Sequence, residues 1–237
     1  MEYDNPAARL LSLLEKCKQK PGHMACKQAW REILDTGKDA ALLMSRLGKV
    51  MELSQVTIEA LRESFPNRET TWSHWNSQVN SAFMNQNLSA TWDTFINHID
   101  HHTIVYLQLS SDLLQGKSTT KLLENEKLNE LRDELTELCD SVINSSLSSE
   151  IKKYITRALR KLVTNIDEYR LTGALPLLEA VEGMVGHACV DVEYKEFMQT
   201  NELGRKLLVT LGAIADAVTV AIGIPQLSHS IGLLQIN

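Results

Sequence analysis

The chain has 237 residues and a mass of 26.6 kDa, with 43% apolar residues, 23% charged residues and a formal net charge of −6. This composition is sufficient to bury a sizeable core, and it excludes an intrinsically disordered chain. A pI near 5.7 speaks against a general nucleic-acid coat, although it leaves room for a local basic site. At about 150 residues per domain, the length fits one elongated domain or two small ones.

The apolar residues recur at three- and four-residue spacing, and only five prolines and eleven glycines interrupt them. This periodicity predicts an all-α fold, a multi-helix bundle. The first helix is expected to begin with Asn5 as its N-cap and Pro6 as its first residue, and to stop at Pro21 and Gly22.

Further helices are predicted in the first half of the chain. A long helical region covers residues 39–65, with a break expected near Ser54. Apolar positions then mark a short helix from Thr70 and one longer helix from Ser89 to Leu113.

The two halves of the chain differ in the residues available for a core. All four tryptophans precede residue 93, whereas the second half is rich in Leu, Ile, Val and Ala. This difference predicts an aromatic helical bundle over residues 1–115 and an aliphatic one over residues 120–237.

The start of the second half is typical of an antiparallel helix hairpin. Apolar residues repeat at three-four spacing over two heptads, a loop follows at residues 144–149, and a second apolar face comes after it. The first arm is acidic and the second is basic. The predicted inward residues are Leu128, Leu131, Leu135, Leu138 and Val142 in the first arm, and Ile151, Tyr154, Ile155, Ala158, Leu162 and Ile166 in the second.

The basic arm carries the first candidate interaction site. A stripe of cations there can bind phosphates or an anionic membrane surface. The alternative is that the two arms simply compensate each other's charge, because individual surface ion pairs are weak. The candidate residues are Lys153, Arg157, Arg160 and Lys161.

A histidine pair is the nearest approach to a metal site. His98 and His102 are four residues apart and would share one face of a predicted helix, which suits two ligands of one metal ion. His102 also lies on an apolar seam, so a packed histidine explains it equally well, and no H-E-x-x-H glutamate is present. We therefore predict no metal and no other cofactor.

Arg68 and His74 are separated by five residues, and this spacing resembles the signature of the all-helical HEPN ribonuclease superfamily. The resemblance implies that an arginine and a histidine act on the RNA backbone at a dimer interface. Glu69 departs from the polar residue that usually follows the arginine. The alternative is that His74 is a surface residue beside two tryptophans.

Residues 207–224 form an apolar run in which Asp216 is the only charged residue. We favour a helix buried on every side in the C-terminal bundle, with Asp216 paired to Arg205, Lys206 or another polar group. Membrane insertion is the alternative, because the length is borderline for a span and the summed insertion energy is near zero.

The C-terminal third, with the segments Tyr169–Gly173 and Gly183–His187 ahead of this run, resembles the ends of uncharacterised helical proteins from bacterial accessory genomes. Some of those proteins are associated with defence against phage. The resemblance implies a bacterial protein that works beside partner proteins, and it assigns no catalytic residue.

Together, these features favour a non-enzymatic helical component of a bacterial, antiphage-defence type of system. It would bind a protein partner or a second copy of itself, with Asp216 as a further candidate interaction residue, and nucleic acid is not the expected partner. The predicted location is the cytoplasm, and contact with the inner membrane through residues 207–224 is the alternative. Two alternatives stay open: a membrane-disrupting effector that inserts residues 207–224, and a HEPN-like ribonuclease.

Overall fold

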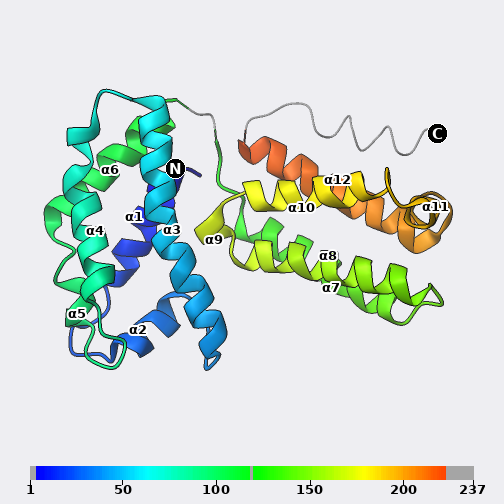
Figure 1. The fold of residues 1–237 in the computed structure, drawn as a ribbon, viewed down its shortest axis with the longest axis horizontal. Coiled ribbons are helices and arrows are strands. Elements are labelled where there is room, and N and C mark those ends of the chain that lie inside the picture. Colours follow the sequence, from blue (N-terminus) through cyan, green and yellow to red (C-terminus); the bar gives the residue numbers. More distant parts are fainter. Residues whose placement is uncertain (1–3, 118–119, 223–237) are drawn as a thin grey trace. The chain divides into compact units, whose positions relative to one another are not determined.

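The computed structural model describes residues 4–117 and 120–222, and this part of the chain is helical throughout (Figure 1). It contains twelve α-helices, one 3-10 turn and no strand, which confirms the all-α prediction. The chain divides into two compact units, Met1–Thr119 and Thr120–Asn237, at the segment where the tryptophan-rich half ends.

In the N-terminal unit, four helices surround one core. Helix α1 packs against α3 and α6, and α4 packs against the same two helices. Two short helices, α2 and α5, contact each other at one end of this bundle (Figure 1). The elements are α1 (Pro6–Lys18), α2 (Cys26–Ile33), α3 (Ala40–Ser64), η1 (Glu69–Thr71), α4 (Ser73–Asn85), α5 (Asp93–Ile96) and α6 (His101–Gln115).

Side-chain hydrogen bonds determine where these helices begin and whether they continue. The Asn5 side chain accepts a hydrogen bond from the Ala8 N–H at 2.9 Å, so the predicted start of α1 is confirmed. The break expected near Ser54 is wrong, because α3 runs unbroken from Ala40 to Ser64. Ser54 donates its hydroxyl hydrogen bond to the Met51 carbonyl, so the helix satisfies this buried group internally.

The single helix predicted from Ser89 to Leu113 is also wrong. The structure has two helices there, α5 and α6, separated by residues 97–100. Asp100 is the N-cap of α6. Its carboxylate accepts hydrogen bonds from the Thr103 N–H at 2.6 Å and the Thr103 hydroxyl at 2.8 Å. An aspartate cap of this kind starts a new helix regardless of the apolar periodicity around it.

Aromatic rings form the core of the N-terminal unit, as the tryptophan distribution predicts. The Trp30 ring lies 5.0 Å from that of Trp92 and 4.8 Å from that of Phe95, both edge to face. The Trp30 indole donates to Gln86 at 2.8 Å, and the Trp92 indole donates to the Cys17 carbonyl at 3.1 Å. These bonds matter because an indole N–H buried without an acceptor would destabilise the core.

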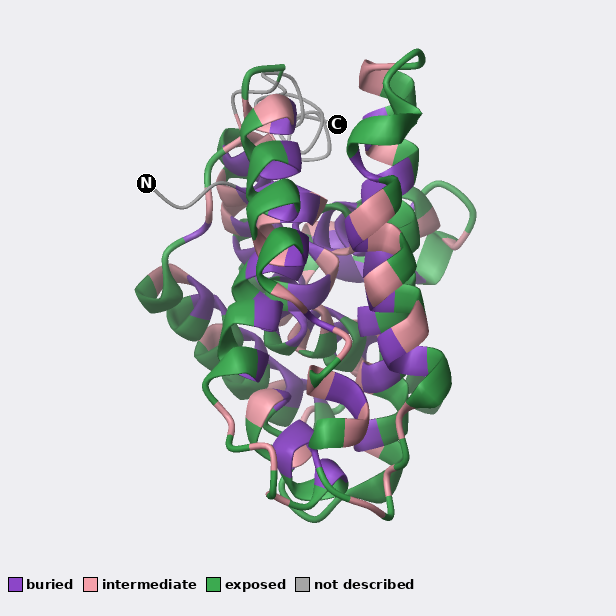
Figure 2. Ribbon diagram, turned by 90° about the vertical axis from the view of Figure 1, so that its left-hand side faces the viewer, coloured by how far each residue is buried: buried purple, intermediate pink, exposed green. Residues whose placement is uncertain are grey.

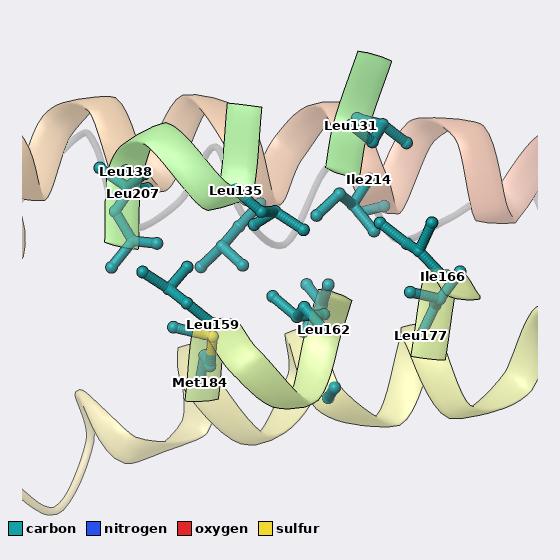
Figure 3. Packing of buried hydrophobic residues seen from close by; sticks show 14 of the residues in the cluster. Leu131, Leu135, Leu138, Leu159, Leu162, Ile166, Leu177, Met184, Leu207 and Ile214 are labelled. Atoms are coloured by element: carbon teal, nitrogen blue, oxygen red, sulfur yellow. The ribbon is translucent and has the colours of Figure 1, made fainter. Parts of the chain in front are cut away.

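Four long helices of the C-terminal unit enclose a second, aliphatic core. Going round it, α7 packs on α8, α8 on α10, α10 on α12, and α12 back on α7. Side chains from all four helices meet between them (Figure 3). The helices are α7 (Asn125–Ile143), α8 (Ser149–Asp167), α9 (Tyr169–Thr172), α10 (Leu175–His187), α11 (Val192–Thr200) and α12 (Glu202–Ile222).

Helices α7 and α8 form the predicted hairpin. All of the residues expected inward on α7 are buried, and those on α8 are buried except for Tyr154 and Ala158, which are half-buried. The three-four leucine repeat therefore determines which side of each helix faces solvent. The helices of the N-terminal unit, which face the viewer in Figure 2, show the same division into a buried inner side and an exposed outer side.

Helix α12 corrects the expectation for residues 207–224. Leu207, Leu211 and Ile214 are buried in the aliphatic core, but Val209 is 65% exposed. Burial on every side is wrong, because among the described residues α12 has neighbours on its inner side only, and Asp216 lies on the exposed face, where no buried partner is needed. Residues 223 and 224 lie outside the described residues.

No helix in residues 4–117 or 120–222 is both long and apolar enough to cross a membrane.

The four cysteines are all free: Cys17, Cys26 and Cys139 are buried, and Cys189 is exposed. Burial raises the pKa of the Cys17 thiol and that of Cys26.

Leu135 provides a direct test of the hairpin core. Its side chain is fully buried, so Leu135→Ala is expected to lower the free energy of unfolding by about 2 to 5 kcal/mol, because it removes buried methyl groups and leaves a cavity. The neighbouring Thr136 is exposed, and Thr136→Ala is expected to change stability by less than about 0.5 kcal/mol. Urea unfolding followed by circular dichroism measures both, and equal effects would contradict this packing.

Candidate functional site

The outer side of α8 carries a line of cations. The buried residues of α8 recur at Ile151, Ile155, Leu159 and Leu162, so residues two positions further along the helix point away from the core. Lys153 and Arg157 stand at two of those positions, and Arg160, one residue after Leu159, is exposed beside them. We call these three cations, which have four- and three-residue spacing, the basic row: Lys153, Arg157 and Arg160.

An open groove of about 400 Å³ lies along the basic row, where the end of α7 meets α8. The Lys152 ammonium donates a hydrogen bond to the Ile143 carbonyl at 3.3 Å and so ties the two helices together at this end. Ile143 is 44% exposed and adds an apolar surface. The groove is lined by Ile143, Lys152, Lys153, Thr156, Arg157 and Arg160.

The basic row has no counter-charge of its own. In the described part of the chain, no salt bridge joins Lys153, Arg157 or Arg160 to a carboxylate. The ion pair that does cross the hairpin is formed by Arg132 and Asp167 at 2.8 Å, near the opposite end from the turn. Direct pairing of the predicted cations with the acidic arm, which was the alternative interpretation, does not occur.

Helix α7 carries a matching line of carboxylates on its own outer side. These residues are exposed or half-buried and follow the three- and four-residue spacing opposite to the buried leucines. We call Asp133, Glu137 and Asp140 the acidic row. Asp133 lies 4.0 Å from the Arg132 guanidinium, which already pairs with Asp167.

A cluster of rings holds α8 against the helices behind it. The Tyr154 ring stacks on His187 of α10 with 3.8 Å between centroids, and it meets Tyr194 of α11 edge to face at 5.0 Å. Burial raises the pKa of the Tyr154 phenol, and the charge of Arg157 acts in the opposite direction. These contacts fix α8 in place, so the cations on its outer side keep their spacing.

The other two predicted interaction residues are not part of this groove. Lys161 is exposed next to Arg160 but does not line it. Asp216 lies on the exposed face of α12.

A second polar cluster lies in the N-terminal unit, where α4 meets the start of α6. His74 contacts the Asp100 carboxylate, with 3.1 Å between Nε2 and Oδ2. The His74 ring also lies 5.6 Å from that of Tyr106 and 6.2 Å from that of His102. The structure thus brings together one residue of the predicted ribonuclease pair and one of the predicted metal pair.

Neither predicted pair is itself assembled. The Arg68 guanidinium lies over the Phe65 ring at 5.8 Å, and no hydrogen bond joins it to His74 in the described residues. His98 precedes the N-cap of α6, whereas His102 lies in its first turn, so they do not share a helical face. No group of three or more metal-ligating side chains occurs in residues 4–117 or 120–222.

Sequence reasoning identified the cations but missed the groups around them. Thr156 and Ile143 enter the groove only because α7 and α8 pack together. The contact of Asp100 with His74 joins residues 26 positions apart. A capping motif, Asp100 followed by Thr103, was the one local signal that could have revealed where α6 begins.

No protein-family model, curated protein or solved structure matches the chain.

Asp100 gives a test that depends on pH. Partial burial acts to raise its pKa, but hydrogen bonds from Thr103 and the contact with His74 outweigh it and lower the pKa to about 2, from 3.8. A carboxyl whose pKa is lower in the folded state than in the unfolded state stabilises the protein at pH values above its unfolded-state pKa. This contribution is lost as the pH falls towards the folded-state pKa. The advantage of the wild type over Asp100→Asn should therefore shrink between about pH 4 and pH 2.

The measurement is urea unfolding followed by tryptophan fluorescence, because all described tryptophans lie in the N-terminal unit. Asn can still cap α6, so Asp100→Asn isolates the charge, whereas Asp100→Ala also loses the cap and should cost about 1 kcal/mol more. A constant difference between wild type and Asp100→Asn across this pH range would contradict the role of the carboxylate.

Proposed function

We propose that the chain is a non-enzymatic helical protein that binds a protein partner through the outer side of α8. One observation carries the proposal: three exposed cations stand in a line beside an open groove, and no carboxylate of the described residues forms a salt bridge with them. We propose further that the chain works in a bacterial, antiphage-defence type of system in the cytoplasm. That setting rests on the resemblance of the C-terminal third alone.

A short acidic protein surface fits the basic row better than a nucleic acid does. The row spans eight residues from Lys153 to Arg160, and its seven helical rises amount to about 10 Å of helix. The acidic row on the adjacent helix and the net charge of −6 repel a long polyphosphate chain. A partner helix with carboxylates at four- and three-residue spacing would meet the cations, and Ile143 would supply an apolar contact at its end.

The ribonuclease alternative finds less support in the geometry. It requires Arg68 and His74 to act on one phosphate, but Arg68 lies over Phe65 and His74 is held by Asp100. The contact of His74 with Asp100 is explained as a tie between α4 and α6. RNA cleavage by the purified protein that disappears in His74→Ala would nevertheless overturn the non-enzymatic proposal.

The membrane-effector alternative requires α12 to leave its bundle. Leu207, Leu211 and Ile214 would lose their contacts with the aliphatic core, and the other three long helices would be left with an exposed apolar face. Each such side chain contributes about 1.5 to 3 kcal/mol when buried. We therefore assign α12 to the core of the C-terminal unit.

Cross-linking in cells tests the binding face. A photo-activated amino acid at Thr164, an exposed position one turn beyond Arg160, is expected to form a cross-link to a protein partner. Reversal of the basic row should reduce this cross-link about tenfold or more, because three favourable contacts become repulsive. The reversed variant is Lys153→Glu/Arg157→Glu/Arg160→Glu.

A matched control separates this effect from the change in net charge. It reverses three exposed cations of the N-terminal unit and should leave the cross-link at the wild-type level. The control is Lys16→Glu/Lys27→Glu/Lys38→Glu. Equal cross-linking in the wild type and the basic-row variant would refute the proposed binding face.

A further inference from the structure

The two charged rows of the hairpin are opposite in sign and overlap along its length. Both rows take a four-residue step and then a three-residue step in chain order. Because α7 and α8 run antiparallel, these orders are reversed in space, and only part of each row is level with the other. Arg132 lies beside Asp167 and Ile143 beside Lys152, which places Glu137 level with Arg160 and Asp140 level with Arg157.

Neither row uses the other within one chain. Glu137 and Asp140, like Arg157, form no salt bridge in the described residues. Both rows point away from the core, on neighbouring helices of one hairpin. A surface that carries opposite charges side by side can be complementary to a rotated copy of itself.

Only one of the two simple symmetric pairings brings opposite charges together. A two-fold axis parallel to the helices places α7 of one copy over α8 of the other and keeps Glu137 level with Arg160 and Asp140 level with Arg157, so the contact forms twice. A two-fold axis across the helices places α7 over α7, where the acidic rows repel each other. The charge pattern therefore selects the first arrangement and disfavours the second.

The size of the surface indicates how strong such a pairing would be. Each helix has 19 residues, or about 28 Å, and two helices side by side are about 20 Å wide. Pairing the two hairpins would bury about 1,100 Å² in total, which is the range of weak, reversible complexes. Because exposed charges provide most of the contacts, salt should weaken the complex strongly.

We infer that the acidic surface recognised by the basic row is the acidic row of a second copy of this chain. The C-terminal units pair through their α7–α8 hairpins, with Arg157 and Arg160 of each copy facing Asp140 and Glu137 of the other. This inference rests on the proposed function, because it names the partner of the same face.

Charge exchange between the rows tests this pairing. One variant reverses the basic row, and a second reverses the acidic row. Each alone should dimerise about tenfold or more weakly than the wild type, because both of its contacts become repulsive. The second variant is Asp133→Lys/Glu137→Lys/Asp140→Lys.

An equimolar mixture of the two variants should dimerise as the wild type does, because every contact between them joins opposite charges. A chain with all six reversals should also dimerise with itself. Sedimentation velocity of the full chain measures these masses in about 50 mM and about 500 mM salt, and the wild-type dimer should be at least about tenfold weaker in the higher salt.

Folding of the variants is checked by circular dichroism and thermal unfolding. Should a reversed variant unfold, the neutral variant Asp133→Asn/Glu137→Gln/Asp140→Asn provides a second test. It should lower dimer formation without gaining affinity for the basic-row variant, since an amide row carries no charge to attract it.

The outcomes distinguish this inference from the proposed function. A wild type that stays monomeric at low salt, while the cross-link from Thr164 still depends on the basic row, overturns the inference and leaves the proposed function with a different protein partner. A wild-type dimer that the mixture of variants fails to restore uses another face, which also overturns the inference. Loss of both readouts refutes both proposals.

Discussion

The whole arrangement depends on burial of the leucine repeat of α7 and its counterpart on α8. These apolar stripes can leave water only against each other and against α10 and α12 (Figure 3). Their burial determines the rotation of both helices about their axes. Every charge on the hairpin is then placed on the outside by the same periodicity, so the core also determines the geometry of the two charged rows.

The apolar periodicity and the capping residues correctly predicted helix starts and buried helix faces where these depend on residues close together in the sequence. The cap formed by Asn5 and the leucine repeat with Leu135 carry strong local signals, and the structure confirms both. The expectation for residues 207–224 failed because an apolar run in the sequence shows which residues a helix contains, but not how many other helices pack around it. A helix at the corner of a four-helix ring keeps one side exposed, whatever its composition, and Asp216 lies there.

The candidate site was predictable only in part, for a related reason. The cations of α8 follow one another on a single helix, so their spacing could be read from the sequence. The groove beside them needs Ile143 from the end of another helix, and the contact of His74 with Asp100 joins two helices. Contacts of this kind arise from tertiary packing, which a single sequence does not display.

The charged rows also have an energetic consequence for the hairpin itself. The positive end of a helix dipole lies at its N-terminus, yet α8 carries Lys152 and Lys153 among its first five residues, and Asp140 lies in the last turn of α7, at the negative end. Each such placement costs about 0.3 to 1 kcal/mol of helix stability. A sequence redesigned only for heat resistance would replace these residues and so erase the surface that we propose for recognition.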